Sequence, residues 1–284
     1  MPSQDIAALL QARYGASPAW LSSLSTSVPN PALENLLAHS SVRAFLRDKP
    51  LPDATLELLV AAGQSAATSS NLQTWSVVSL TDPDMKRRAA VLSADQAFIH
   101  EAPLFLIFCA DLQRLTAVSD LRGTGGEALE YTEMFLMASI DAALASQNVT
   151  VAAEAMGLGA CYVGAVRNRP REMADLLALP ERVIALFGLA VGFPDPQRPA
   201  SVKPRLGVDE VLHKEGWGGG HDGETQVQKF SKYDDALVSF NAGQKREGVP
   251  AWTERSAKRV EGISNLSGRH IWSDVLKERK FDMK

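Results

Sequence analysis

The segment from about Leu129 to Met156 constrains the fold more than any other part of this 284-residue chain. Met, Phe, Leu, Ile, Val and Ala occupy nearly every side of the helix that it predicts, and Gly157-Leu158-Gly159 follows as a helix stop. Its polar residues are too costly for the hydrocarbon core of a membrane: Asp141, Gln147, Asn148 and Glu154. We therefore expect a buried helix, surrounded either by its own domain or by a second subunit of a homodimer.

The rest of the chain predicts a sheet with helices between its strands. Four β-rich runs are bounded by Pro, Gly or charged residues, at 75–80, 104–109, 161–163 and 183–191. Between and before them lie helical patterns, including one that begins at Ala32 and ends at His39 and one that Asp53 is expected to cap and that ends near Gly63. This order is typical of an α/β or α+β sheet protein.

Breaks in the pattern suggest how the chain is divided. Residues 1–30 contain a short amphipathic stretch followed by repeated Gly, Ser and Pro residues, which favours an appended N-terminal arm. We expect residues 31–284 to form a single domain. Within it, residues 207–284, including a glycine-rich stretch at 216–223, have too few apolar residues for a core of their own and are interpreted as an excursion.

Composition excludes several classes of protein. A formal net charge of −4 with scattered Lys and Arg argues against a nucleic-acid surface. Cys109 and Cys161 are far apart in apolar runs, so we expect buried, inert thiols. The first residues do not resemble a secretory signal, which makes the cytoplasm the expected location. None of the five histidines has metal-ligand spacing, and we predict no metal.

Familiar catalytic motifs are absent as well. The sequence contains neither a Gly-x-Ser-x-Gly elbow nor a phosphate loop ending in Gly-Lys-Ser/Thr. Gly123, Gly125 and Gly126 do not complete a dinucleotide fingerprint, because Ala128 stands at its last position and no strand precedes them. A turn is the better interpretation of these glycines.

The segment His39-Ser40-Ser41-Val42-Arg43 is the best remaining candidate for a ligand site. Alternation in an extended segment places His39, Ser41 and Arg43 on one side, where an imidazole, a hydroxyl and a guanidinium suit a phosphate dianion. Polar residues that merely end a helix are the alternative interpretation of this pattern.

A series of motifs in fixed order gives the segment a context. His-x-Ser-x-Arg is followed by Ser69-Ser70-Asn71-Leu72-Gln73-x-Trp75, then by the runs at 102–111, 157–164 and 188–192, and finally by Lys203-Pro204-Arg205-Leu206. From about Ala32 to the end, this order resembles the FMN-dependent nitroreductases, and most of all their major type, the oxygen-insensitive NADPH nitroreductases and flavin reductases. The resemblance implies an α+β fold with a central mixed β-sheet flanked by helices. It also implies a homodimer with FMN at each of two subunit interfaces and a C-terminal excursion that wraps the partner subunit.

The resemblance also assigns cofactor-binding residues. Contacts to the FMN phosphate and ribityl chain are implied for His39, Ser40, Ser41, Arg43, Lys203 and Arg205. Contacts to the ring and ribityl oxygens are implied for Ser69, Ser70, Asn71, Leu72 and Gln73, although the family often has another residue at Asn71. A contact to the polar edge of the flavin is implied for Gln96, with a solvent-facing helix position as the alternative. Backbone contacts to the reactive ring nitrogen are implied for Tyr162, Val163, Gly164 and Ala165, the last of which is commonly glycine in the family.

The implied reaction is a ping-pong hydride transfer and needs no catalytic acid or base of its own. NADPH or NADH would reduce FMN, and nitroaromatics, quinones or free flavins would be the acceptors. Lys245 and Arg246 are NADPH candidates, with a solvated charged loop as the alternative. Two other functions stay open: a non-catalytic protein that binds or senses FMN, and a flavin-fragmenting or dehalogenating enzyme on the same scaffold.

Overall fold

The computed structural model describes residues 6–16, 30–218, 225–246 and 248–284. Most of the predicted arm, at 1–5 and 17–29, and residues 219–223 of the glycine-rich stretch lie outside the described residues. The chain forms two compact units. We call Met1–Ser40 with Ala200–Asn265 the excursion unit and Ser41–Pro199 with Leu266–Lys284 the sheet unit.

The sheet unit is built on four strands in the order β1-β2-β4-β3. Their bounds are Trp75–Leu80 (β1), Leu104–Asp111 (β2), Gly159–Val163 (β3) and Val183–Gly192 (β4). All three pairs of neighbouring strands are antiparallel, so the parallel part of the expected mixed sheet is limited to an isolated bridge between Ser41 and Ala160. The four predicted strands are thus confirmed, and β1 and β3 are the two edges of the sheet.

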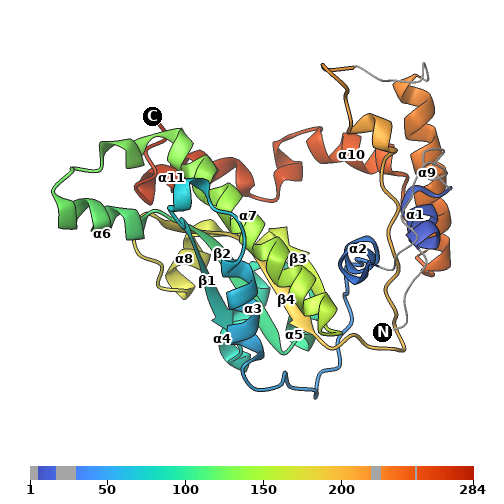
Figure 1. The fold of residues 1–284 in the computed structure, drawn as a ribbon, viewed down its shortest axis with the longest axis horizontal. Helices are drawn as coiled ribbons and strands as arrows, with labels where there is room; N and C mark the ends of the chain where they lie inside the picture. The colour runs from blue at the N-terminus through green and yellow to red at the C-terminus, as the bar shows by residue number, and fades with distance from the viewer. Residues whose placement is uncertain (1–5, 17–29, 219–224, 247) are drawn as a thin grey trace. The chain divides into compact units, whose positions relative to one another are not determined.

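One face of the sheet is covered by α7 (Thr132–Ala155), which lies beside α3 (Thr55–Gln64) in Figure 1. Small residues of α7 let this helix approach the strands closely: Ala138, Ala142 and Ala145. They belong to the same core cluster as the even-numbered residues of β2, Leu104, Leu106 and Phe108. The predicted apolar helix is therefore confirmed. No helix among the described residues has the length and apolar character needed to cross a membrane.

The odd-numbered residues of β2 point to the opposite face, because side chains alternate along a strand. Phe105 and Ile107 are fully buried there. Shorter helices contribute to this side, namely α4 (Pro83–Leu92), α5 (Ala97–Glu101) and α8 (Pro170–Leu176), and α4 contacts both α8 and β1. Both faces of the sheet are covered, which is why β2 consists of apolar residues almost without interruption.

The sheet unit is completed by residues from the far end of the chain. After α6 (Gln113–Arg122), the remaining helix of this unit is α11 (Trp272–Glu278). Val275, Leu276 and Phe281 are buried in the same core cluster as α7. Residues 266–284 therefore return to the sheet unit, and only residues 207–265 of the predicted excursion lie outside it.

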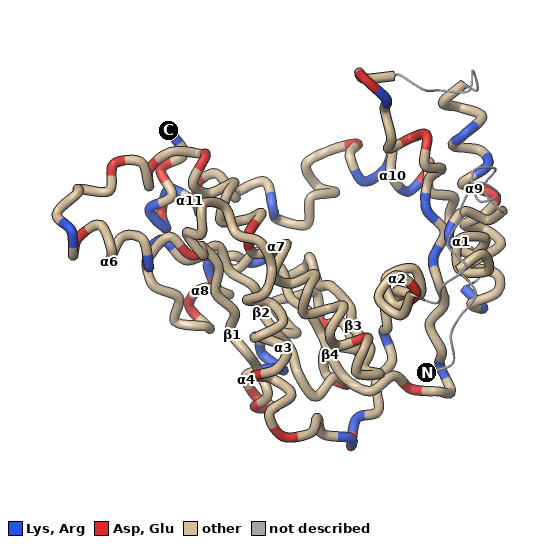
Figure 2. The backbone as a smooth tube through the Cα atoms, viewed as in Figure 1, with Lys and Arg blue, Asp and Glu red and all other residues tan. Residues whose placement is uncertain are grey.

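The excursion unit contains α1 (Ile6–Tyr14), α2 (Pro31–Leu37), α9 (Gln226–Gly243) and α10 (Trp252–Val260). Local sequence explains where two of these helices begin. Asn30 accepts a hydrogen bond from Leu33 N before Pro31, and Thr225 forms a reciprocal capping box with Gln228 at the start of α9. Basic and acidic residues are interspersed along the backbone of both units (Figure 2).

Candidate functional site

The predicted phosphate segment is extended along β3 where it enters the sheet unit. Val42 N donates to Ala160 O at 3.0 Å, and the side chain of Val42 is buried against Gly159. A Cβ at position 159 would lie 2.6 Å from Val42 Cγ2, so glycine is required there. Arg43 is exposed and Ser41 is half-buried on either side of buried Val42, which fits the alternation expected of an extended segment. His39 and Ser40 belong to the excursion unit.

Both cysteines are buried and unpaired, as predicted. Burial raises the pKa of the Cys161 thiol, and the positive charge of Arg43 partly opposes this rise. Burial, followed by the charge of Asp111, raises the pKa of Cys109 to about 12. Both thiols are therefore protonated at neutral pH and unsuited to nucleophilic chemistry.

The predicted flavin loop, Ser69–Gln73, has an unusual backbone. Ser70, Asn71 and Gln73 all have positive φ, at 48°, 55° and 53°. Residues other than glycine adopt this conformation at an energetic cost, and they do so where surrounding contacts enforce it. The loop therefore needs an anchor outside itself.

That anchor is Asp141 of α7. Its carboxylate accepts from Ser69 N at 3.0 Å, from Thr74 N at 3.3 Å and from Thr74 Oγ1 at 3.0 Å, and its exposed fraction is 1%. One buried carboxylate thus holds both ends of the loop. In the sequence, Asp141 is an acid within an apolar helix, which argues against a membrane span and is the one indication of this anchoring role.

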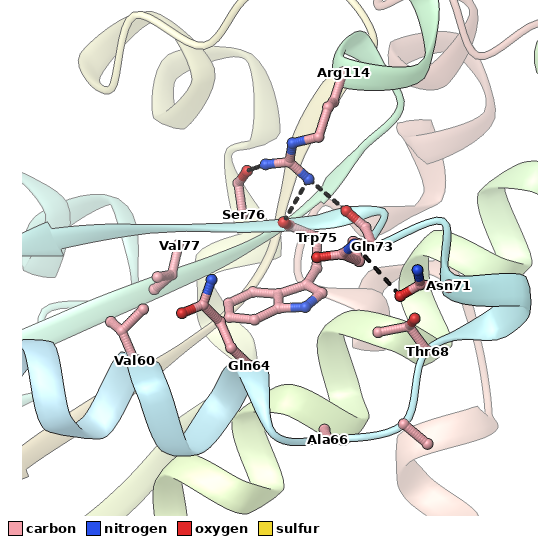
Figure 3. Close-up of a pocket in the computed structure, with 11 residues that line it drawn as sticks. Val60, Gln64, Ala66, Thr68, Asn71, Gln73, Trp75, Ser76, Val77 and Arg114 are labelled. Atoms are coloured by element: carbon pink, nitrogen blue, oxygen red, sulfur yellow. Dashed lines mark hydrogen bonds between the residues drawn. The ribbon is translucent and has the colours of Figure 1, made fainter. Parts of the chain in front are cut away.

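A cavity of about 610 Å³ lies beside this loop. In Figure 3 the ring of Trp75 lies between Gln64 and Gln73, and Asn71 faces the same space. Arg114 of α6 lies at its rim, where it donates to Gln73 O, to Trp75 O at 3.3 Å and to Ser76 Oγ at 3.1 Å. These bonds fix the backbone at the point where the loop becomes edge strand β1.

The end of β3, with Tyr162 and Val163, and the turn after it hold the residues predicted to face the reactive part of the ring. The hydroxyl of Tyr162 donates to Ser146 Oγ and accepts from Thr150 Oγ1, each at 3.1 Å, so α7 fixes the ring of this tyrosine. Burial raises the pKa of Tyr162. Gly164 and Ala165, both half-buried, follow in a 3-10 turn (Gly164–Asn168) and present almost no side chain.

Gln96 has a local partner in the structure. It is the N-cap residue of α5, and its side-chain amide donates to Ser93 O at 3.2 Å. Its proposed contact with the flavin edge stays a prediction.

The basic residues implied for the flavin phosphate and for NADPH in the C-terminal part of the chain lie in the excursion unit, namely Lys203, Arg205, Lys245 and Arg246. Arg205 Nη1 donates to Lys203 O at 3.2 Å and to Pro204 O at 3.1 Å. Lys245 and Arg246 are exposed just after α9, where Gln244 Nε2 donates to Ser201 Oγ at 2.8 Å. The NADPH candidates therefore follow a helix end that is joined to the segment carrying Lys203.

The sheet separates two groups of predicted site residues. Trp75, which follows the Ser69–Gln73 loop, pairs with Ala110 at the end of the sheet where β4 begins. Ser41 lies beside Ala160, which pairs with Val191 at the other end and on the opposite edge. Standard strand spacing puts Trp75 and Ala160 roughly 14 Å apart across the sheet and about 23 Å apart along it. Within one sheet unit, the loop and the phosphate segment do not meet.

Comparison with known proteins identifies the family of the chain. The model of the nitroreductase family matches residues 36–193, and the model of that family's C-terminal domain matches residues 203–284. The chain belongs to the nitroreductase family. The matched regions include the phosphate segment, the flavin loop and the basic pair, whereas α1 lies outside them.

Relatives within the nitroreductase family match most of the chain. It is 35% identical over 257 residues to the FMN reductase (NADPH) of Bacillus subtilis, covering 89% of this chain and 99% of that one. It is 33% identical over 216 residues to the oxygen-insensitive NADPH nitroreductase of Salmonella typhimurium, covering 74% and 82%. The solved structure of the NADPH:FMN oxidoreductase of Vibrio harveyi complexed with NAD+ is 30% identical, with a TM-score of 0.76 and coverage of 90% and 100%.

Proposed function

We propose that this protein is an FMN-dependent oxidoreductase that takes a hydride from NAD(P)H and passes it to electron-poor acceptors. Nitroaromatics, quinones and free flavins are the acceptor classes. The family match across both the sheet unit and the C-terminal region is the observation on which the proposal rests. Relatives named as NADPH-dependent FMN reductases and nitroreductases support it.

The residues present fit the phosphate of FMN. Arg43 is exposed and points away from the core, together with the hydroxyl of Ser41. Lys203 and Arg205 supply further positive charge, and the guanidinium of Arg205 donates to neutral carbonyl oxygens. A phosphate dianion is a stronger acceptor than a carbonyl, so these donors favour it. His39 and Ser40 complete the proposed set.

When bound, FMN supplies the acceptor and donor of the hydride, and the protein supplies binding and orientation. Gly164 has no side chain and Ala165 only a methyl group, which would let a flat ring approach the backbone after β3. Tyr162 is fixed by its bonds to Ser146 and Thr150 and borders this turn. The Ser69–Gln73 loop, fixed by Asp141, would contact the ring and the ribityl oxygens.

The separation of these groups supports a homodimer. If one flavin contacts both the phosphate segment and the Ser69–Gln73 loop, the two must come from different copies of the chain. An apolar stripe on α7 supports such an assembly, since Leu136, Ile140 and Leu144 are 50%, 56% and 43% exposed at a helical spacing of four. Residues 200–265 would wrap the second copy.

NADPH is the proposed donor, with Lys245 and Arg246 as candidates for binding its additional phosphate. Both side chains are exposed in the unit that contains Lys203 and Arg205. The need for a nicotinamide donor, together with two unpaired thiols, supports a cytoplasmic location.

Anaerobic stopped-flow reduction tests the proposal. We expect the purified protein to be yellow, to be bleached by NADPH faster than by NADH, and to regain its colour when a nitroaromatic or quinone is mixed in. Yellow protein that neither donor bleaches would instead identify a non-catalytic FMN-binding protein. Colourless protein that does not take up FMN would refute flavin chemistry altogether.

A further inference from the structure

Helix α1 belongs to the arm that precedes the region matched by the family model. It is nevertheless packed into the excursion unit. Leu9 and Leu10 are buried, and α1 contacts α2. Gly15, just after the helix, approaches α9 so closely that a Cβ there would lie 3.0 Å from the Cβ of Ala236. The helix is therefore held against both α2 and α9.

Arg13 of this helix joins two segments that are distant in the sequence. Its Nη2 donates to Leu37 O at 3.0 Å and to His39 O at 3.2 Å, where α2 ends. Its Nη1 donates to Lys203 O at 3.0 Å. Its own carbonyl oxygen accepts from Arg205 N at 2.8 Å. All these bonds lie within the excursion unit.

Both segments contain residues that the proposed function assigns to the flavin phosphate. His39 begins the first group, and Lys203 and Arg205 form the second. A guanidinium is suited to this task because its N–H groups form a rigid planar fork that reaches several acceptors at once. The carbonyl of Leu37 is also one of the last carbonyls of α2, which the helix itself leaves without a partner.

We infer that Arg13 is a positioning residue of the flavin phosphate site. It fixes the backbone of His39 relative to the backbones of Lys203 and Arg205, so that their side chains are set for a phosphate before flavin binds. This inference rests on the proposed FMN site. It gives the N-terminal arm a role in cofactor affinity, because preorganised donors lose less conformational freedom when the ligand arrives.

The inference is tested by comparing FMN with riboflavin, which has the same ring and ribityl chain but no phosphate. Flavin is removed from the full-length protein, and the quenching of flavin fluorescence on titration gives each Kd. For Arg13→Ala we expect the Kd for FMN to rise about tenfold or more, equivalent to about 1.4 kcal/mol. The Kd for riboflavin should stay as in the unchanged protein.

Two matched variants on the same helix separate this role from folding of the arm. Gln11→Ala changes an exposed residue and is expected to leave both affinities unchanged. Leu10→Ala removes a buried side chain but keeps Arg13, so it should lower the thermal midpoint without changing the FMN-to-riboflavin ratio. If Arg13→Ala does not fold, Arg13→Gln is measured in its place. Its amide retains a donor but lacks the planar fork of the guanidinium, so we again expect the Kd for FMN to rise and the Kd for riboflavin to stay the same.

Each outcome is decisive. An FMN-specific loss in the Arg13 variant alone supports the inference. An unchanged FMN affinity, an equal loss for both flavins, or the same FMN-specific loss in Leu10→Ala overturns it while the proposed function stands. If the unchanged protein takes up neither flavin, the proposed function fails and the positioning role fails with it.

Discussion

Replacing Asp141 with Asn removes one charge without changing the shape of the side chain. The carboxylate accepts from Ser69 N on Oδ1 and from Thr74 N and Thr74 Oγ1 on Oδ2. An amide has only one acceptor oxygen, so in either orientation its NH2 group faces a backbone N–H at one end of the loop. Thr74 is fully buried, so its backbone N–H cannot form a hydrogen bond with water instead. One lost charge-assisted bond is worth about 1.5–3 kcal/mol and the unpaired buried donor costs about 1–3 kcal/mol, so we expect a loss of about 2.5–6 kcal/mol.

Two measurements check this expectation. Urea unfolding at fixed protein concentration gives the loss in the free energy of unfolding. Hydrogen exchange followed by mass spectrometry reports the amides of Ser69 and Thr74, which should exchange about tenfold faster for every 1.4 kcal/mol lost from the loop. Asp175→Asn, the same change at an exposed helix position, serves as the control and should be neutral. The reasoning is refuted if Asp141→Asn is as stable as the unchanged protein and its loop amides stay equally protected.

Three further predictions concern other parts of the sheet unit. Arg43→Ala should leave folded but colourless protein, because each charge-assisted bond to a phosphate contributes about 1.5–3 kcal/mol; unchanged flavin absorbance after purification would contradict this. Gly159→Ala should cost about 1–3 kcal/mol by overpacking Val42, whereas Gly243→Ala, which meets no atom within 4 Å, should be neutral in the same urea experiment. Burial alone would raise the pKa of Glu101, but bonds from Phe45 N, Arg47 and Arg198 lower it overall. The stability that Glu101 contributes relative to Glu101→Gln should therefore be present at pH 7 and decline as pH falls below about 4.3, the ordinary Glu value. An equal difference in the free energy of unfolding between the two proteins at pH 7 and below this value would argue against it.

The strands and the long helix were predictable because their residues are dictated by burial. Strand β1 begins and ends where its apolar run does, at Trp75 and Leu80. The orientation of Ser41 and Arg43 followed from alternation alone, since it needs only an extended backbone and a buried Val42. Local periodicity is sufficient wherever one face of a segment must avoid water.

Contacts between distant segments were not predictable in this way. Asp53 was expected to cap a helix, but the N-cap position is Ala54, in a left-handed conformation, so that prediction was wrong. The roles of Asp141 and Arg13 depend on acceptors and donors 24 to 190 residues away, which no local pattern indicates. Nor does the sequence show that β1 and β3 are opposite edges of the sheet, although this order decides whether one chain is sufficient for a site.

The return of residues 266–284 to the sheet unit has a consequence for how the protein is made. Val275, Leu276 and Phe281 fill the core beside α7, although more than a hundred residues separate them from that helix in the chain. A ribosome adds residues at about 5–20 per second, and domains usually fold as they emerge. Here the sheet unit must wait, with part of its core exposed, until this last stretch has left the ribosome. Chaperones that bind nascent chains are therefore expected to hold this chain until residues 266–284 are available, longer than the position of the strands in the sequence suggests.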